Sequence, residues 1–337
     1  MSKKTTVLLL NLGTPKSPNV TDVRSYLFEF LNDKRVINIP WLLRKILVNL
    51  IIVPFRAKGS SKIYKKLWAK DGSPLLIYGR KVKDLLQREL DDNYQVELAM
   101  RYQQPSMNKV LEKIRKEMPE KLIILPMYPH YASSTTGSTF EKAMEIIKIW
   151  EVIPEIKFVK QFFDHDGYLN TIVDNAQKHD LNEFDHFLFS YHGLPVRQIN
   201  KVHPDRNCLD CKCNEQYNRS TDYFCYRATC FETSRLLAKK LNISNDKYTV
   251  AFQSRLDKNW MKPFSDKIIE ELAQNGAKKI MIFSPAFVAD CLETTVEIGI
   301  EYRELFEKNG GEKLILVDSL NDHPKWIKTL KDLVINN

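Results

Sequence analysis

The sequence predicts an α/β protein of two Rossmann-like domains, each a four-stranded parallel sheet flanked by helices. Eight apolar runs of strand length recur along the chain, and most are continuous, as expected for strands buried on both faces. Amphipathic helical patterns separate these runs, and the runs fall into two groups of four. The alternation of strand and helix predicts parallel sheets, and the grouping predicts two domains of similar build.

The predicted strands cover, in order, residues 5–12, 95–102, 122–128, 156–162, 186–191, 248–253, 279–285 and 313–317. Helices between them include "NKVLEKIRKEM" and "DKIIEELAQNG", the second of which ends at Gly276. We expect an N-terminal domain over residues 1–154, a C-terminal domain over residues 155–322 and a C-terminal helix over residues 323–337.

The composition is that of a soluble globular protein, with 337 residues, 43% hydrophobic and 28% charged. No run approaches the ~20 apolar residues of a membrane-spanning helix. The opening "MSKKTTVLLLNLGTP" indicates a first strand closed by Gly-Thr-Pro, because its apolar run is short for a signal peptide and no small-residue cleavage site follows. We therefore expect a cytoplasmic protein in which clustered cysteines bind metal.

The net charge of +9 is compatible with nucleic acid, an anionic membrane surface or small anionic substrates as partners. The basic residues are spread out, with a modest concentration at residues 56–70 and no Lys/Arg tract. Aromatic interleaving of the RNP type is also missing, so we expect no nucleic-acid partner.

Residues 39–59, "IPWLLRKILVNLIIVPFRAKG", depart from the alternating pattern. The segment is strongly apolar, although Arg44 and Lys45 interrupt it. The default interpretation of such a stretch is a buried helix. The alternative is an exposed apolar lip that faces a membrane or a hydrophobic ligand.

The carboxyl ends of the predicted strands supply the candidate site, because ligands of open α/β sheets bind there. His192 follows one apolar strand and can serve as a base, as a metal ligand or merely as a capped strand-end residue. After a later strand, Asp290, Glu293 and Glu297 share one face of a predicted helix. The opposite, packed face is predicted to consist of Leu292, Val296 and Ile300. Such carboxylates suit proton relay or guidance of a divalent cation, unless they form an ordinary solvated surface.

The stretch "SSTTGS" at residues 133–138 resembles an anion-binding helix start, with hydroxyls, a glycine and free backbone N–H groups. It has no P-loop lysine, and the chain has no G-x-G-x-x-G motif, so nucleotide binding is poorly supported. A helix N-cap without a ligand is the alternative.

Five of the six cysteines form a cluster, in which Cys208, Cys211 and Cys213 are C-x2-C-x-C and Cys225 and Cys230 are C-x4-C. The polar loop between them cannot form a core of its own, so a metal could hold it. All-sulfur ligation fits tetrahedral zinc or an iron–sulfur cluster, and the residues alone do not separate the two. Either group needs four ligands, so Cys230, at the start of the next helix, could be a buried structural thiol.

Six motifs together resemble the motif series of the ferrochelatase family, in family order over nearly the whole chain: "LLLNLGTP", "AMRYQQP", "YPHYASSTTGS", "SYHGLP", "FQSRLDKNW" and "FVADCLET". The resemblance implies two Rossmann-like domains that enclose a porphyrin cleft. It also implies a lyase that inserts Fe²⁺ into protoporphyrin IX with release of two protons, the last step of haem biosynthesis.

The resemblance assigns roles to residues in these motifs. The family's essential histidine matches His192, as proton acceptor or metal ligand, and its acidic helix matches Glu293 and Glu297, as a relay for protons or metal. His192 and Glu293 are then the implied ligands of the substrate iron. Many members have a histidine where this chain has Cys291, so the resemblance does not extend to a second histidine.

The same motifs imply contacts to the porphyrin. The Arg-Tyr pair and the tryptophan of the "SR…W" motif match residues of the family's cleft, and the serine of "DGSPL" matches one associated with a propionate. Arg56 is a candidate second propionate partner. The implied substrate-binding residues are Arg56, Ser73, Arg101, Tyr102, Tyr128, Ser133 and Trp260.

The cysteines resemble those of bacterial members that carry an internal [2Fe–2S] cluster. The resemblance implies that four of the five bind one cluster, with zinc as the alternative; the candidates are Cys208, Cys211, Cys213, Cys225 and Cys230. Cys230 is the weakest of these, since some members keep a cysteine there without a cluster, and Cys291 is expected not to be a ligand. Because protoporphyrin is hydrophobic, an exposed segment 39–55 would also favour peripheral contact with the inner membrane.

Two kinds of alternative stay open. One is a coproporphyrin III ferrochelatase or another tetrapyrrole metal chelatase, although the apolar segment and the "CLET" variant favour protoporphyrin, which has only two carboxylates. The other is a cluster- or zinc-stabilised nucleic-acid-binding protein, an alternative that the basic charge and the cysteines favour.

Overall fold

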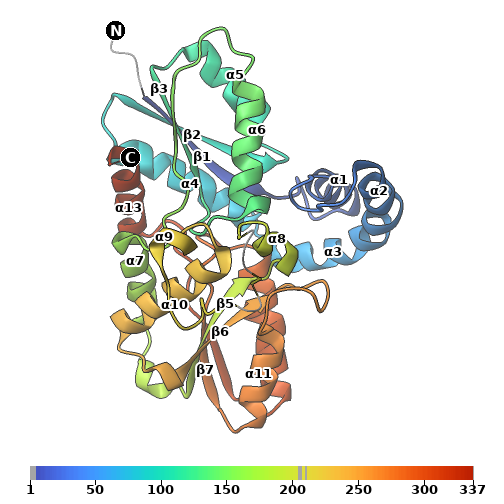
Figure 1. The fold of residues 1–337 in the computed structure, drawn as a ribbon, viewed down its shortest axis with the longest axis vertical. Helices are drawn as coiled ribbons and strands as arrows, with labels where there is room; N and C mark the ends of the chain where they lie inside the picture. The colour runs from blue at the N-terminus through green and yellow to red at the C-terminus, as the bar shows by residue number, and fades with distance from the viewer. Residues whose placement is uncertain (1–4, 204–206, 209–210, 337) are drawn as a thin grey trace. The chain divides into compact units, whose positions relative to one another are not determined.

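The computed structural model describes residues 5–203, 207–208 and 211–336, which form two compact units. Unit 1 contains the described residues up to Tyr128, residues Ala132–Gln161 and those from Asn321 on. Unit 2 contains Pro129–Tyr131 and Phe162–Leu320. Each unit holds one four-stranded parallel sheet flanked by helices, which confirms the predicted fold class (Figure 1).

The sheet of unit 1 has the strand order β2-β1-β3-β4. All three neighbouring pairs are parallel. The third strand ends at Pro126, two residues before the predicted end, although Met127 still donates its N–H to the Leu10 carbonyl at 2.7 Å. The bounds are β1 Thr5–Gly13, β2 Tyr94–Tyr102, β3 Lys121–Pro126 and β4 Glu155–Phe158.

Helices cover both faces of this sheet, and η1 and η2 are π-helical. On one face α4 packs so closely against β2 that a Cβ added at Gly79 would lie 3.2 Å from the Leu98 side chain. The C-terminal helix α13 packs on α4. The helices are α1 Val20–Leu31, α2 Trp41–Ile46, η1 Leu47–Ile52, α3 Val53–Leu67, α4 Pro74–Glu89, α5 Met107–Glu117, η2 Ser133–Gly137, α6 Ser138–Ile147 and α13 Pro324–Ile335.

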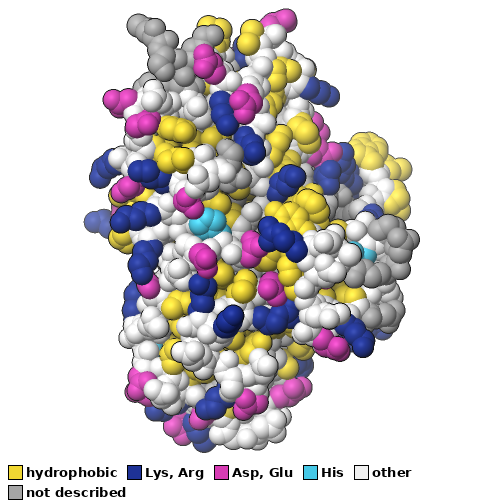
Figure 2. Space-filling model, turned by 60° about the vertical axis from the view of Figure 1, so that its left-hand side comes forward, with side chains coloured by type: hydrophobic (Ala, Val, Ile, Leu, Met, Phe, Trp, Pro, Cys, Tyr) yellow, Lys and Arg dark blue, Asp and Glu magenta, His cyan; other side chains and the backbone are white. Residues whose placement is uncertain are grey.

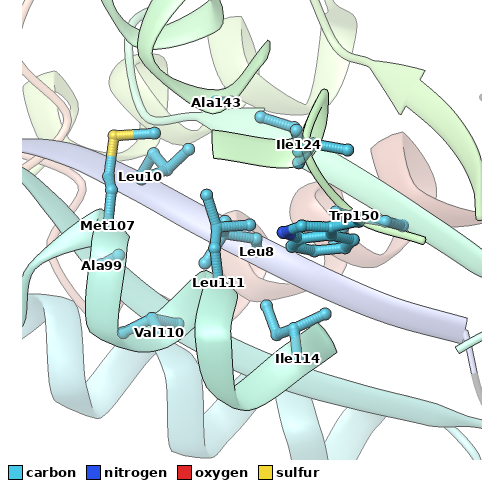
Figure 3. Packing of buried hydrophobic residues seen from close by; sticks show 12 residues of the cluster. Leu8, Leu10, Ala99, Met107, Val110, Leu111, Ile114, Ile124, Ala143 and Trp150 are labelled. Carbon is cyan, nitrogen blue, oxygen red and sulfur yellow. The ribbon is translucent and has the colours of Figure 1, made fainter. Parts of the chain in front are cut away.

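The core of unit 1 lies between the sheet and helices α5 and α6 (Figure 3). Leu8 and Leu10 of β1 alternate onto this face, and Leu111 and Ile114 of α5 meet them, as the strand period of two and the helix period of 3.6 require. Trp150 closes the end of the cluster. Burial of these side chains, at roughly 1.5–3 kcal/mol for a large apolar one, fixes the sheet from which the strand ends project.

Unit 2 repeats this plan with the strand order β6-β5-β7-β8, again all parallel. Its sheet is covered on one face by α11, η5 and α12, whose apolar residues pack on Leu188, Ile280 and Ile282. The bounds are α7 Asp166–Ala176, η3 Leu181–Glu183, β5 His186–His192, α8 Val196–Asn200, α9 Arg219–Asp222, α10 Tyr226–Leu241, η4 Asn245–Lys247, β6 Tyr248–Gln253, α11 Ser265–Gln274, β7 Lys279–Phe283, η5 Leu292–Tyr302, α12 Arg303–Lys308 and β8 Lys313–Leu316.

The apolar segment at residues 39–59 is not a buried helix, so the default interpretation is wrong. It forms α2, η1 and the start of α3, which lie beside α1 at one side of the unit 1 sheet (Figure 1). Phe55 is 80% exposed, Leu50 69% and Trp41 65%, whereas Val53 is buried. Other exposed apolar side chains of the segment are Leu42, Leu43, Ile46 and Ile51. This contiguous set, called here the apolar lip, is unusual on a protein surface.

No helix within the described ranges is both long enough and apolar enough to span a bilayer.

Candidate functional site

His192 is the last residue of β5, so the sheet delivers its imidazole to the carboxyl edge of unit 2. Its Nδ1 lies 2.7 Å from the carbonyl oxygen of Gly193. A carbonyl can only accept, so Nδ1 carries the proton and Nε2 keeps a lone pair. No described residue hydrogen-bonds Nε2, and the ring is therefore held in the tautomer of a base or ligand.

Two aromatic side chains stand beside this imidazole. The ring of Trp260 lies 6.1 Å from it and that of Phe287 lies 6.5 Å from it, centroid to centroid. A Cβ at Gly193 would lie 3.0 Å from the Gln253 carbonyl oxygen and 3.3 Å from the Trp260 ring. The glycine of the "SYHGLP" motif thus allows the turn to pack under Trp260.

Gln253, which the sequence did not single out, joins this edge to the acidic helix. It pairs with His192 across β5 and β6, and its side chain is buried. Its Oε1 accepts from Ser190 Oγ at 2.7 Å. Its Nε2 donates to the Glu293 carbonyl oxygen at 3.1 Å and to Glu297 Oε2 at 3.0 Å. The buried amide therefore uses both of its ends to fix the start of η5 relative to His192.

Glu297 is surrounded by donors. Besides Gln253, its carboxylate accepts from Ser254 N at 2.9 Å, Ser254 Oγ at 2.5 Å and Tyr302 OH at 3.0 Å. Ser254 adopts φ +62°, a left-handed conformation that costs energy in a residue other than glycine and that here directs its N–H at the carboxylate. Burial, and then the Glu297 charge, raise the pKa of Tyr302 well above its usual range, so its hydroxyl stays protonated and donates.

Glu293 has a different environment. It is half-buried, and its carboxylate lies beside the thiol of Cys291. Burial, and then the Glu293 charge, raise the pKa of Cys291, so this thiol stays protonated. In the part of the chain that the structure describes, Glu293 receives none of the backbone and hydroxyl donors that surround Glu297. Glu293 is therefore the carboxylate with capacity for another partner.

The acidic helix differs from the one that the sequence predicted. Residues Leu292–Tyr302 form a π-helix, so the α-helical spacing that placed three carboxylates on one face does not apply, and Asp290 lies before the helix begins. The buried side is formed by Thr294, Val296, Ile298 and Tyr302. The prediction of a packed face made by Leu292, Val296 and Ile300 is thus wrong for two of its three residues.

In unit 1, a buried carboxylate that the sequence missed organises two of the predicted residues. Asp33 follows α1 and accepts from Arg101 Nη2 at 2.5 Å, Tyr102 OH at 2.9 Å and Ser138 Oγ at 2.5 Å. The backbone N–H of Arg35 adds a fourth bond at 2.7 Å. Burial opposes ionisation, but these bonds and the Arg101 charge outweigh it and hold the pKa of Asp33 below its ordinary value. The Asp33 cluster, meaning Asp33, Arg101, Tyr102 and Ser138, joins α1, β2 and α6.

Two other predicted residues of unit 1 lie near this cluster, since Arg35 contacts Ser133 and the Arg101 charge acts on Tyr128. Ser133 accepts from Arg35 Nη1 at 2.9 Å at the start of η2. Ser73 is buried at the N-terminus of α4, and its hydroxyl has no hydrogen-bond partner among the described residues. Burial raises the pKa of Tyr128. Arg56 is exposed on α3, and no described acidic side chain pairs with it.

The thiols of Cys211 and Cys213 lie close together, with their sulfur atoms 3.2 Å apart. Arg227 Nη1 lies 2.7 Å from the Cys213 sulfur. Cys208 and Cys225 are buried nearby and interact electrostatically with Cys211. In chemical type, this all-thiol donor set suits zinc or an iron–sulfur cluster. In the described ranges, however, no three His, Cys, Asp or Glu side chains are arranged to hold a metal ion.

The two remaining thiols have other surroundings. Cys230 is fully buried within α10, and burial raises its pKa well above the ordinary value. Cys291 caps the start of η5 through reciprocal contacts with Thr294. Both environments suit structural thiols.

The basic charge forms no tract on the visible surface. Figure 2 shows Lys and Arg side chains interspersed with acidic ones across the face that it draws. The face drawn there shows no continuous basic stripe of the kind found on nucleic-acid-binding proteins.

Comparison with known proteins adds to this geometry. The family model described as Ferrochelatase matches residues 4–337. The ferrochelatase of Coxiella burnetii (strain Dugway 5J108-111) is 44% identical over 336 residues, which cover 98% of this chain and 92% of that protein. The ferrochelatase of Legionella pneumophila (strain Lens) is 44% identical over 329 residues, 97% of this chain and 98% of that protein.

Solved structures support the fold. SirB from Bacillus subtilis with Fe³⁺ matches with a TM-score of 0.54 and 9% identity, over 99% of this chain and 96% of that one. The sirohydrochlorin chelatase SirB from Bacillus subtilis subspecies spizizenii, in complex with cobalt, matches with a TM-score of 0.55 and 9% identity, over 98% and 94% of the two chains. At such identity the likeness concerns the fold alone.

The Asp33 cluster gives a stability prediction. Asp33→Asn should lower the free energy of unfolding at pH 7 by about 3–5 kcal/mol, because it leaves the partly buried Arg101 without its counter-charge. A carboxyl whose pKa is lowered by folding contributes stability above its unfolded pKa of ~3.9 and loses it as pH falls through the folded value. The difference between wild type and variant, measured by urea unfolding, should therefore shrink below about pH 4.

Glu141→Gln is the matched control, because Glu141 pairs with the more exposed Lys34 and Arg35. It should cost less than about 1 kcal/mol. An Asp33→Asn protein as stable as wild type at pH 7 would show that the cluster does not stabilise unit 1.

Proposed function

Since the chain belongs to the ferrochelatase family, we propose how its residues carry out that family's reaction. The protein is a lyase of haem biosynthesis that inserts ferrous iron into protoporphyrin. The observation that carries the assignment of residues is the lone pair of His192 Nε2, held at a strand end beside two aromatic rings and tied through Gln253 to the acidic helix.

His192 is the proposed proton acceptor. Protoporphyrin carries two inner N–H groups, and both protons must leave when Fe²⁺ enters. A neutral imidazole that presents a lone pair can take such a proton. The bond from Nδ1 to the Gly193 carbonyl also stabilises the imidazolium, because the charged ring remains a donor there. Nε2, which holds this lone pair, is also the atom through which His192 would bind the substrate iron if it served as a metal ligand instead.

Glu293 and Glu297 are proposed to divide the work. Glu293 has capacity for a proton or a ferrous ion and is the proposed relay and iron ligand next to His192. Glu297 accepts four hydrogen bonds, so we assign it a positioning role, which fixes η5 and with it the Glu293 backbone. This division narrows the expectation that both carboxylates act as relays.

The porphyrin itself is proposed to meet apolar and basic groups. Trp260 and Phe287 offer ring faces to a flat macrocycle beside His192. Arg56 is a free cation for a propionate, and the unpaired hydroxyl of Ser73 is a second candidate partner. Arg101 and Tyr102 are committed to Asp33, so any contact they make with substrate would be additional to that ion pair. Tyr128 and Ser133 remain proposed contacts on the residue match alone.

The cysteines are proposed to hold a [2Fe–2S] cluster through Cys208, Cys211, Cys213 and Cys225, with zinc as the alternative. Cys230 is the thiol left out, because it is fully buried inside α10. When bound, the cluster would supply one-electron redox chemistry. The four cysteines would then tie the loop to the first turn of α10, which the polar loop cannot do by packing.

The apolar lip is proposed to rest on the inner membrane from the cytoplasmic side. Its exposed Trp41, Leu50 and Phe55 resemble the apolar face of an interfacial helix, and Lys45 lies within the same segment for contact with anionic headgroups. A hydrophobic substrate such as protoporphyrin partitions into the same layer, which makes protoporphyrin the favoured substrate over coproporphyrin. The predicted division near residue 154 and the separate C-terminal helix differ from the two units, because Glu155–Phe158 and the residues from Asn321 on belong to unit 1.

His192→Ala should abolish iron insertion, by at least about 10²-fold, in a folded protein. Glu293→Gln should lower turnover more than Glu297→Gln and leave the melting temperature unchanged. Glu297→Gln should lower the melting temperature, because its amide N–H₂ would face donors. Porphyrin consumption with Fe²⁺ under anaerobic conditions and thermal unfolding by circular dichroism provide the measurements. Near-normal turnover of folded His192→Ala would remove His192 from the mechanism.

Membrane contact can be tested by a charged double substitution, Leu50→Asp with Phe55→Asp. It should weaken binding to vesicles of anionic phospholipid by more than about tenfold, because two large apolar side chains of roughly 1.5–3 kcal/mol each lose their burial. Val53 is unsuitable for this test because it is buried. Ile149→Asp with Val152→Asp, at exposed apolar positions elsewhere in unit 1, is the control and should bind as wild type. Equal binding of both variants would make the lip an ordinary surface.

The cysteine assignment predicts a brown protein whose visible absorption bands are bleached by dithionite. Single serine substitutions at Cys208, Cys211, Cys213 and Cys225 should each remove the colour, because all four are ligands, whereas Cys230→Ser should keep it. Iron and zinc analysis of the same samples distinguishes the two metals. A colourless, active protein with one zinc per chain would overturn the cluster and leave the ferrochelatase assignment standing.

A further inference from the structure

The backbone of His192 has a partner outside its own sheet. The hydroxyl of Tyr226 donates to the His192 carbonyl oxygen at 2.9 Å. This carbonyl belongs to the peptide group that also contains the Gly193 N–H, which donates to the Gln253 carbonyl oxygen at 2.8 Å. Both ends of the peptide that follows the imidazole are therefore tethered. The Gly193 carbonyl, which sets the tautomer of His192, comes directly after it.

Tyr226 is the first residue of α10, directly after Cys225. The next residue, Arg227, places Nη1 2.7 Å from the sulfur of Cys213 and 3.7 Å from that of Cys211. One turn further on, the Cys230 thiol lies beside the Tyr226 hydroxyl. The first turn of α10 thus contacts the thiols on one side and the backbone of His192 on the other.

The phenol of Tyr226 is held rigidly. Its side chain is buried, and its ring stands edge-on to that of His130 at 6.0 Å. His130 donates from Nε2 to Thr233 Oγ1 at 2.9 Å, since Thr233 already donates to the Phe163 carbonyl. Burial lowers the pKa of His130 to about 3, so the ring next to Tyr226 is neutral. Because a carbonyl oxygen can only accept, the Tyr226 hydroxyl is the donor in its bond to the His192 carbonyl.

We propose that Tyr226 is a positioning residue that couples the state of the cysteine loop to His192. When the thiols of Cys211 and Cys213 change partner, Arg227 and the first turn of α10 lose or gain a fixed neighbour. Tyr226 carries any resulting shift to the His192 carbonyl, and the adjoining Gly193 carbonyl carries it to Nδ1. The state of the loop thereby adjusts where the imidazole points without any loop residue touching the substrate.

This inference rests on the proposed role of His192, and its mechanism is geometric. A rigid group that links two sites transmits a shift only if both contacts persist, and removal of one hydroxyl breaks the link while leaving the ring in place. Loss of the coupling should therefore be separable from loss of the fold and from loss of the thiols.

The test combines Tyr226→Phe with Cys213→Ser in protein labelled at histidine for NMR. The ring resonance of His192, assigned by its disappearance in His192→Ala, is recorded without substrate, and iron insertion is measured in parallel. In the wild-type background Cys213→Ser should shift the His192 resonance and lower turnover. In the Tyr226→Phe background it should leave that resonance unmoved. Tyr226→Phe alone should lower turnover about three- to tenfold at unchanged porphyrin KM, as loss of one hydrogen bond predicts.

Tyr168→Phe is the matched control, because its buried hydroxyl also donates to a backbone carbonyl of unit 2, that of Pro285. In that background Cys213→Ser should shift His192 as in wild type. An equal shift with and without the Tyr226 hydroxyl would overturn the proposal.

If Tyr226→Phe does not fold, alkylation of the wild-type thiols with iodoacetamide replaces the double substitution. The ring resonances of Tyr226 and His192 should then move together, and movement of His192 alone would refute the link. Normal turnover of His192→Ala would refute the proposed function instead, whatever the resonances show.

Discussion

The buried amide of Gln253 is the interaction on which the proposed active edge of unit 2 depends. An amide has a donor end and an acceptor end, and burial makes it costly to leave either unpaired. Ser190 satisfies the acceptor end, while the carbonyl of Glu293 and the carboxylate of Glu297 satisfy the donor end. Two strands and the π-helix are therefore fixed by one side chain. Because β5 and β6 are parallel, Gln253 can end its strand directly opposite His192.

Unit 1 solves a similar problem with a charge. Asp33 could not remain buried and ionised without partners, and Arg101, Tyr102, Ser138 and the Arg35 N–H supply them. The partners come from the loop after α1, the end of β2 and the start of α6. The cluster therefore also fixes the end of α1, beside which lie the helices that carry the apolar lip. The lip itself is left exposed, and this exposure gives the proposed membrane contact its physical basis.

The cysteine loop is the part of unit 2 that packing explains least. Its polar residues bury little apolar surface. Its thiols cluster around Arg227, whose charge is partly buried and needs polar partners. The first turn of α10 contacts both this loop and the backbone of His192, so the loop is structurally linked to the proposed base. An iron–sulfur cluster bound in the loop would therefore be linked to the proposed base His192 without taking part in metal insertion.

Much of this protein could be predicted from its sequence. Continuous apolar runs predicted eight parallel strands, because strands buried on both faces have no polar side to alternate. The ordered motifs indicated the ferrochelatase family, and the strand-end position of His192 marked it as a candidate, because strand ends of parallel sheets meet at one edge. Those inferences depend on local pattern, which the sequence contains.

Only the tertiary structure decided the partners. Asp33, Ser254 and Tyr302 are ordinary polar residues in the sequence. The fold brings Ser254 to Glu297, 43 positions away, and Asp33 to Ser138, 105 positions away. Tyr302 reaches Glu297 within the same helix. The donors that surround Glu297 and leave Glu293 with capacity for a partner come from Gln253, Ser254 and Tyr302, and only the fold brings them together. Phe55 is exposed and Val53, two residues before it, is buried. Both are apolar, so only the packing of the helices determines which of the two faces the core.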